Sequence, residues 1–213
     1  MILRHNTRGV LFRELNADEY YIKRLKPNSI KNFIDIGANV GIISILFRLL
    51  HTNTNILCVE PHPTTYQGLV SNVANMKINT LQGALGTGQD FYLFKDRKMD
   101  MCNSFMDIKT DNTFIKSYTI SQIIEYSKLD INDLFIKIDC EGGEKYMFED
   151  KETMNIINKL KMLAIEFHPK FDIKIGPLFN ELTKMMHKTH KVEYVNHSDG
   201  TLNAIYMMKG LEV

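Results

Sequence analysis

One short segment, residues 33–44, constrains the fold more than any other part of the chain. Its sequence is FIDIGANVGIIS: an apolar run, a turn that contains Gly37 and Gly41, and then apolar residues at helical spacing. Such an apolar run is typical of a strand covered on both faces of a parallel sheet. Glycine lacks a Cβ, so the backbone can approach a ligand closely at these two positions. The segment therefore predicts a strand–turn–helix unit of an α/β fold, with a nucleotide-like cofactor at the turn.

The glycine spacing distinguishes between two cofactor classes. Dinucleotide sites use G-x-G-x-x-G, which places a pyrophosphate at a helix N-terminus. Here the pattern is Asp-x-Gly-x-x-x-Gly from Asp35, with only two glycines, and it suits a nucleoside without a pyrophosphate, such as S-adenosylmethionine (SAM). Glu60 ends the next apolar run, where an acid can accept hydrogen bonds from ribose hydroxyls. A solvated strand end beside an ordinary turn is the simpler alternative, but the two features together favour a nucleoside site.

Length and charge limit the organisation and the partners. A chain of 213 residues suits one domain, which we expect to cover residues 1–210. Residues 211–213, with the sequence LEV, resemble the start of a protease site added for protein production, which allows for further domains in a longer parent protein. The net charge of +1 lacks the basic field that nucleic-acid binding relies on. We therefore expect no nucleic-acid partner.

Cysteine content and hydropathy indicate the compartment. The three cysteines form no CxxC pair, which argues against a disulfide framework or a zinc–thiolate site and favours a reducing environment. No apolar run approaches the roughly eighteen residues of a membrane span, and the N-terminus lacks a signal-peptide core. The sequence predicts a cytoplasmic protein without a membrane partner.

Short apolar runs alternate with helical patterns along the chain, as in a doubly wound parallel sheet. Strands are expected at residues 33–36, 56–60, 80–85, 134–139 and 162–167, with a closing antiparallel pair at 192–196 and 203–208. Helices are expected at residues 40–50, 66–75, 119–126 and 172–190. Residues 86–112 are expected to form an irregular excursion around a short strand at 91–94. The predicted fold is a three-layer α/β domain with a mostly parallel seven-stranded sheet and an antiparallel C-terminal strand pair.

A second strand and glycine turn, residues 134–144, repeats the design of the first. Lys137, Asp139 and Glu141 alternate along it, so we expect their side chains on one side, at the end of the strand where ligands bind in open α/β sheets. The alternative is a structural ion pair between Lys137 and Asp139 beneath the loop.

The following strand ends in two further candidates, Glu166 and His168, again two residues apart. If the two strands are neighbours, Asp139, Glu166 and His168 converge. His168 or a carboxylate could then act as a general base toward a hydroxyl, or Asp139, Glu166 and His168 could bind a divalent cation that acidifies it. A histidine before proline can also be an ordinary strand end. The candidate catalytic residues are Lys137, Asp139, Glu141, Glu166 and His168.

Three blocks, in this order, resemble the FkbM-type SAM-dependent methyltransferases of the Rossmann-like class I fold. They are FIDIGANVGIIS, CVEPHPTTYQGLVSNV and FIKIDCEGGEKYMF, and AIEFHP follows them. The resemblance covers nearly the whole chain. It implies methyl transfer from SAM to an oxygen, as in family members that O-methylate sugars such as rhamnose or fucose, or polyketide hydroxyls.

The resemblance also implies a role for individual residues. Asp139 and Glu141 would lie by the methyl group and the acceptor, and Gly143 stands where the family often has alanine. Contacts to the methionine part of SAM are expected from Asp35, Gly37, Ala38, Asn39 and Gly41, contacts to the ribose from Glu60, and contacts to the adenine from Gln82, Gly83, Ala84 and Leu85. Pro61 and His62 directly follow Glu60, and this position predicts that they line the adenosine side of the pocket. The catalytic base is not carried over from the family.

The resemblance implies methyl transfer to an oxygen, and acid-rich strand ends hydrogen-bond polyols well. The favoured hypothesis is therefore an O-methyltransferase of a sugar or glycan. Two other classes remain open: an O-methyltransferase of a polyketide or other small molecule, and a non-catalytic SAM-binding module. A nucleic-acid base methyltransferase would carry an Asn-Pro-Pro-aromatic loop at the end of the fourth strand, where this chain has DCEG at residues 139–142.

Overall fold

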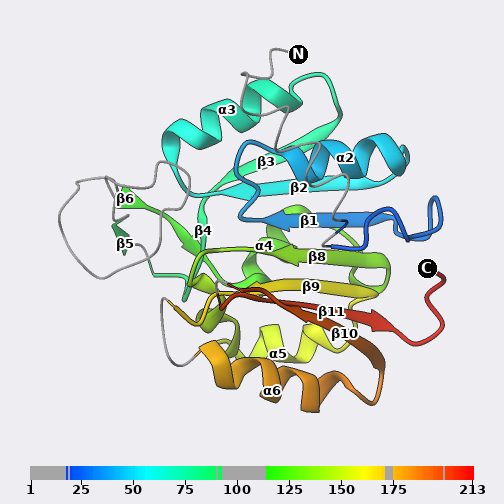
Figure 1. The fold of residues 1–213 in the computed structure, drawn as a ribbon. Coiled ribbons are helices and arrows are strands. Elements are labelled where there is room, and N and C mark those ends of the chain that lie inside the picture. Colours follow the sequence, from blue (N-terminus) through cyan, green and yellow to red (C-terminus); the bar gives the residue numbers. More distant parts are fainter. Residues whose placement is uncertain (1–17, 19, 90, 93–113, 171–174, 199) are drawn as a thin grey trace.

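The centre of the protein is a twisted sheet of seven strands with helices on both faces (Figure 1). The computed structural model describes residues 18, 20–89, 91–92, 114–170, 175–198 and 200–213. The strand order is β10-β11-β9-β8-β1-β2-β3, and β11 runs antiparallel to both of its neighbours. The predicted three-layer α/β fold, with its mostly parallel sheet and antiparallel C-terminal pair, is confirmed.

The strands of this sheet are β1 (Asn32–Ile36), β2 (Asn55–Glu60), β3 (Ile78–Gln82), β8 (Leu134–Ile138), β9 (Met162–Phe167), β10 (His190–Asn196) and β11 (Leu202–Met208). Two small sheets pair β4 (Ala84–Leu85) with β7 (Ser117–Tyr118), and β5 (Phe91–Tyr92) with β6 (Phe114–Ile115). The helices are α2 (Ile42–Leu50), α3 (Pro63–Val73), α4 (Ile120–Ser127), α5 (Lys151–Ile157) and α6 (Ile175–Met186), with short 3-10 helices η1 (Ile131–Asp133) and η2 (Gly143–Phe148).

Every residue of β1 and β8 is buried, as expected of central strands covered on both faces. On one face, Phe33 stacks on Phe47 of α2 with ring centroids 4.2 Å apart, beside Phe135 of β8. On the other face, Ile34 and Ile136 pack with apolar residues of α4, α5 and α6. The two faces of the sheet therefore have separate hydrophobic cores.

Several element boundaries differ from the sequence-based prediction. The expected strand 80–85 is divided into β3 and β4 at Gly83. Gly83 packs closely against the Tyr118 ring, since a Cβ on Gly83 would lie only 2.5 Å from a ring carbon. Beyond it, β4 leaves the main sheet and pairs with β7. The expected helix 172–190 ends at Met186, and His190 instead begins β10, where it pairs with Met208. Helix α5 and η2 were not predicted. The expectations for residues 93–112 and 172–174 fall outside the described residues.

The strand order reverses between β1 and β8, because the chain proceeds from β1 to β2 on one side and from β8 to β9 on the other. Ligands in open α/β sheets bind at such a switch point, beyond the carboxyl ends of the strands. Backbone hydrogen bonds hold these ends together, from Gly37 N to Val59 O and from Asp139 N to Ile36 O, each 3.0 Å long. Within the described ranges, no helix is long and apolar enough to span a bilayer.

Candidate functional site

The turn after β1 depends on glycine for a reason that the sequence did not reveal. Gly37 and Gly41 have φ angles of 76° and 86°, in the left-handed region that favours glycine. A Cβ on Gly37 would lie 1.8 Å from the carbonyl oxygen of Asp139, and one on Gly41 would lie 2.7 Å from Leu69 Cδ1. The close approach predicted for a ligand at these two positions is therefore made by the protein's own atoms.

Asp35 and Lys137 form a buried ion pair beneath this turn. Asp35 has no exposed surface, accepts a hydrogen bond from Ser44 Oγ and lies 3.2 Å from Lys137 Nζ. Lys137 Nζ also donates to Gly37 O (3.0 Å) and lies 3.4 Å from Asp139 Oδ2. Burial lowers the pKa of Lys137, but Asp35 and Asp139 outweigh it and raise the pKa, so the side chain remains a cation. The ion pair between Lys137 and Asp139, stated above as the structural alternative, is present, but the nearer partner of Lys137 is Asp35, behind the turn.

Glu60 connects two turns at the carboxyl end of β2. Its oxygens accept hydrogen bonds from the backbone N–H groups of Asn39 and His62, both 2.9 Å long. Burial raises the pKa of Glu60 to about 7, and these two hydrogen bonds oppose the rise. The predicted adenine segment adjoins Glu60, because Gly83 N donates to its carbonyl oxygen. His62 also caps α3, which begins at Pro63, because its Nδ1 accepts a hydrogen bond from Thr65 N.

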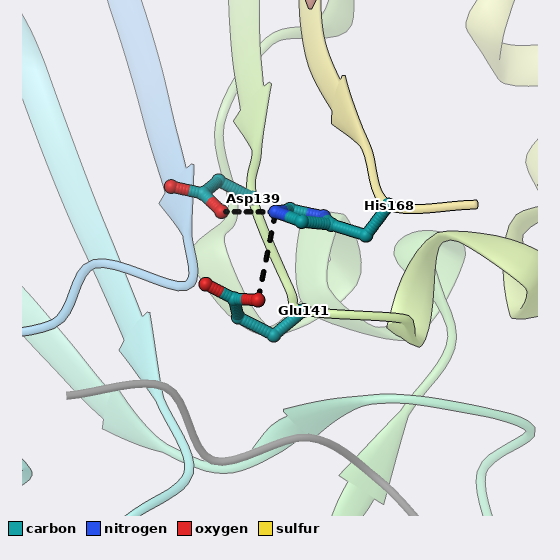
Figure 2. Close-up of side chains that lie close together, drawn as sticks. All are labelled: Asp139, Glu141 and His168. Atoms are coloured by element: carbon teal, nitrogen blue, oxygen red, sulfur yellow. Dashed lines mark ion pairs between the residues drawn. The ribbon is translucent and has the colours of Figure 1, made fainter. Parts of the chain in front are cut away.

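Acidic side chains surround His168 at the carboxyl ends of β8 and β9, which are neighbouring parallel strands (Figure 2). His168 Nε2 lies 3.7 Å from Asp139 Oδ1 and 3.6 Å from both Glu141 Oε2 and Glu166 Oε1. The predicted convergence of Asp139, Glu166 and His168 is therefore present. Glu141 joins them, because its backbone turns sharply with a φ of 49°.

Sequence reasoning missed two residues of this cluster. Glu144 is fully buried and its Oε1 accepts a hydrogen bond from His168 Nδ1 (2.9 Å) and one from Cys140 N. Tyr20 donates from its Oη to Glu166 Oε2 (2.9 Å) and lies 3.2 Å from Asp139 Oδ2. Glu144 ends the CEGGE motif and could have been considered from its spacing. Tyr20 offered no signal, because it precedes Asp139 by 119 residues.

The cluster has unusual ionisation. Burial lowers the pKa of His168. The neighbouring carboxylates outweigh burial and raise this pKa to about 9, with the largest effect from Glu144 and smaller ones from Asp139 and Glu141. Burial, and then Asp139, raise the pKa of Glu166 to about 7. At neutral pH His168 therefore carries a proton on each ring nitrogen and cannot accept another. Among the predicted candidates for a general base, the structure favours Glu166 over His168.

Comparison with known proteins agrees with this architecture. The family model of the methyltransferase FkbM domain matches residues 35–194. The chain belongs to the FkbM methyltransferase family. Among solved structures, an FkbM methyltransferase from Methylobacillus flagellatus KT is similar, with a TM-score of 0.55 and 18% identity over 92% of this chain and 52% of that one. The FkbM chain described here thus spans about half the length of that protein.

Two further solved structures share the fold of this FkbM-family chain. A putative rRNA methylase from Clostridium thermocellum has a TM-score of 0.54 and 9% identity, over 92% of this chain and 95% of that one. The METTL16 methyltransferase domain has a TM-score of 0.52 and 14% identity, over 92% of this chain and 66% of that one. At this level of identity the likeness shows the fold alone. No curated protein gives a significant match to the chain.

Proposed function

We propose that this FkbM-family protein is a SAM-dependent O-methyltransferase that acts on a hydroxyl of a sugar or glycan. The observation that supports the proposal most is the cluster of Asp139, Glu141, Glu166 and His168 at the switch point, beside the turn after β1. Membership of the family accounts for methyl transfer. The cluster adds a candidate proton acceptor and several carboxylate oxygens, which are suitable partners for polyol hydroxyls.

The residues around the turn fit SAM, which would supply the methyl group on a positively charged sulfur. Acidic side chains, such as those of Asp139 and Glu166, favour a cation. Glu60 would hold the ribose, and the segment from Gln82 to Leu85, next to it, would border the adenine. Asp35 and Lys137 would act from behind, by holding the turn in place.

The proton of the acceptor hydroxyl would pass to Glu166. A general base works best with a pKa near the working pH, and the pKa of Glu166 is raised to about 7. Tyr20 orients this carboxylate through its hydrogen bond to Oε2. Holding the hydroxyl in line with the methyl group supplies much of the rate, because it removes the entropic cost of bringing two reactants together.

A polyol acceptor also agrees with the charge of the protein. The net charge is +1, and the candidate site is acidic. A polyanion such as nucleic acid would meet repulsion there. We therefore propose a neutral sugar or glycan as the partner.

The test starts with isothermal titration of SAM, followed by transfer of labelled methyl from SAM to a panel of deoxy-sugar glycosides. We expect binding and a methylated sugar. Glu166→Gln should bind SAM normally and lose about 10²–10⁴-fold in rate, the usual contribution of a general base. Glu181→Gln, an exposed glutamate on α6, is the matched control and should keep full activity.

Each part of the proposal can fail separately. Absence of SAM binding would overturn the cofactor. Binding with methylation of polyketide hydroxyls, but of no sugar, would move the acceptor to another class. Full turnover by Glu166→Gln would remove Glu166 from its role, and full turnover by Asp139→Ala would do the same for Asp139.

A further inference from the structure

Three side chains of the cluster come together closely enough to share one metal ion. Asp139, Glu141 and His168 each offer one ligand atom, and these atoms all lie within 4.8 Å of one another. Figure 2 shows the three side chains pointing toward one another, His168 from the end of β9 and the two carboxylates from the loop after β8. Ligands that sit about 2.1 Å from a common ion lie roughly 3–4 Å apart. The separations of 3.6 and 3.7 Å between His168 Nε2 and the two carboxylates fit that spacing.

The ring of His168 is oriented as in many metal-binding histidines. Such a histidine uses one ring nitrogen for the metal and donates from the other to a carboxylate, which fixes the ring. His168 Nδ1 lies 2.9 Å from Glu144 Oε1, and Glu144 has no exposed surface. The backbone N–H groups of Cys140 and Gly142 hold the Glu144 carboxylate in place. The other nitrogen, Nε2, consequently faces Asp139 and Glu141.

The charge balance and one buried oxygen give an independent reason for a cation. Asp139, Glu141, Glu144 and Glu166 surround the single imidazole of His168, and the nearby Lys137 is shared with the buried Asp35. Negative charge is thus in excess in a largely buried place, which is costly unless it is paired. Glu141 Oε2 is buried and accepts no hydrogen bond. A metal ion would give this oxygen a partner and offset the charge.

We propose that Asp139, Glu141 and His168 bind a divalent cation, which displaces the proton from His168 Nε2 into solvent, with Glu144 as the positioning residue for His168. This set differs from the one that the sequence suggested, because Glu141 takes the place of Glu166. A mixture of imidazole and carboxylate suits Mn²⁺ or another first-row transition ion better than Mg²⁺, which prefers oxygen ligands alone. The inference deepens the proposed function and rests on it for its purpose. A cation here would lower the pKa of an acceptor hydroxyl beside it, so Glu166 could take the hydroxyl proton even though the same cation lowers its own pKa.

The test is titration of MnCl₂ into chelator-treated protein without SAM or acceptor, followed by calorimetry and by the loss of the free Mn²⁺ electron paramagnetic resonance signal. We expect one Mn²⁺ per chain. Glu141→Gln should weaken binding at least tenfold, and Glu144→Gln about 10–100-fold, the usual effect of an orienting carboxylate. Glu181→Gln should bind Mn²⁺ as the wild type does. Circular dichroism of each variant checks that it is folded.

The outcomes separate the cation site from the proposed function. No Mn²⁺ binding by folded wild-type protein, or equal binding by Glu141→Gln, would overturn the site, and methyl transfer that is insensitive to chelator would then stand on its own. Mn²⁺ binding that Glu141→Gln and Glu144→Gln weaken supports the site even if no sugar is methylated, and in that case only the proposed function fails.

Discussion

His168 links the stability of the metal-free protein to pH through a single side chain. Its pKa is raised from 6.5 to about 9, because Glu144, Asp139 and Glu141 together outweigh the effect of burial. Between these two values the folded protein holds a proton that the unfolded chain releases. This contribution to stability is complete below pH 6.5 and is lost as the pH rises to about 9. Glu166 acts in the same direction at lower pH, between 4.5 and about 7.

We therefore expect the free energy of unfolding of the wild type to fall by roughly 2–3 kcal/mol more than that of His168→Gln between pH 6 and pH 9.5. The measurement is urea denaturation in the presence of a chelator. His187→Gln, at an exposed histidine after α6, should follow the wild type. The same pH dependence for wild type and His168→Gln would contradict the ionisation derived from the structure.

Lys137 is a second residue whose substitution should lower the free energy of unfolding by a predictable amount. Lys137→Met would leave the buried Asp35 without its cationic partner, with Ser44 as its remaining hydrogen-bond donor. Breaking a buried ion pair from one side costs about 3–5 kcal/mol, and we expect a loss of that size in urea denaturation. The double variant Asp35→Asn, Lys137→Met should recover much of it, because the fully buried charge of Asp35 is removed together with its partner. A double variant no more stable than Lys137→Met would argue against the ion pair as the cause.

At the scale of elements, the contact between the turn after β1 and the end of β8 depends on Gly37. Gly37→Ala would place a methyl group 1.8 Å from the Asp139 carbonyl oxygen and would strain a φ of 76°. The strain alone costs about 1–2 kcal/mol, and the clash can be relieved only by moving the backbone that carries Asp139. We expect a larger loss of stability than this in thermal unfolding, together with weakened SAM binding.

Gly176 provides the matched control for this substitution. It lies in α6, and a Cβ there would meet nothing within 4 Å. Gly176→Ala should be neutral or stabilise by up to about 1 kcal/mol, because alanine is the better helix former. Equal effects of the two substitutions would show that the β1–β8 contact has no special importance.

At the scale of the whole molecule, the candidate site draws its parts from the segment around Tyr20, both halves of the sheet and the loop after β8. A ligand that binds only the folded form stabilises it, by about 2.7 kcal/mol at a hundred times its Kd. For a chain of this length, that corresponds to a rise in Tm of roughly 5–10 °C. We expect SAM to produce such a rise in differential scanning fluorimetry.

ATP is the matching control ligand, because it carries the same adenosine with a polyanion in place of the positively charged sulfur. In the presence of a chelator the acidic cluster should repel ATP, so ATP at the same concentration should leave the Tm unchanged. An equal rise with ATP would indicate a general nucleotide site and would contradict the expected preference for a cationic nucleoside.

The local pattern of the chain by itself determined the class of fold and the strand ends that carry the acids. Apolar runs, helical spacing and glycine turns are short-range features, so they were sufficient to place residues 33–44 and 134–139 and to bring Asp139, Glu166 and His168 to one edge of the sheet. The same patterns could not decide where β3 ends or where α6 stops, because Tyr118 and Met208, from distant segments, determine those boundaries.

Only the tertiary structure decided how the site is built. The Asp139 carbonyl occupies the space beside Gly37, and Lys137 pairs with Asp35. Tyr20, which is distant in the sequence, contacts the carboxylates of Asp139 and Glu166. In the folded protein Glu144 also hydrogen-bonds to His168 Nδ1, and Glu141 lies beside His168 Nε2. The physical reason is that burial, ion pairing and pKa depend on what surrounds a side chain, and residues distant in the sequence supply most of those surroundings.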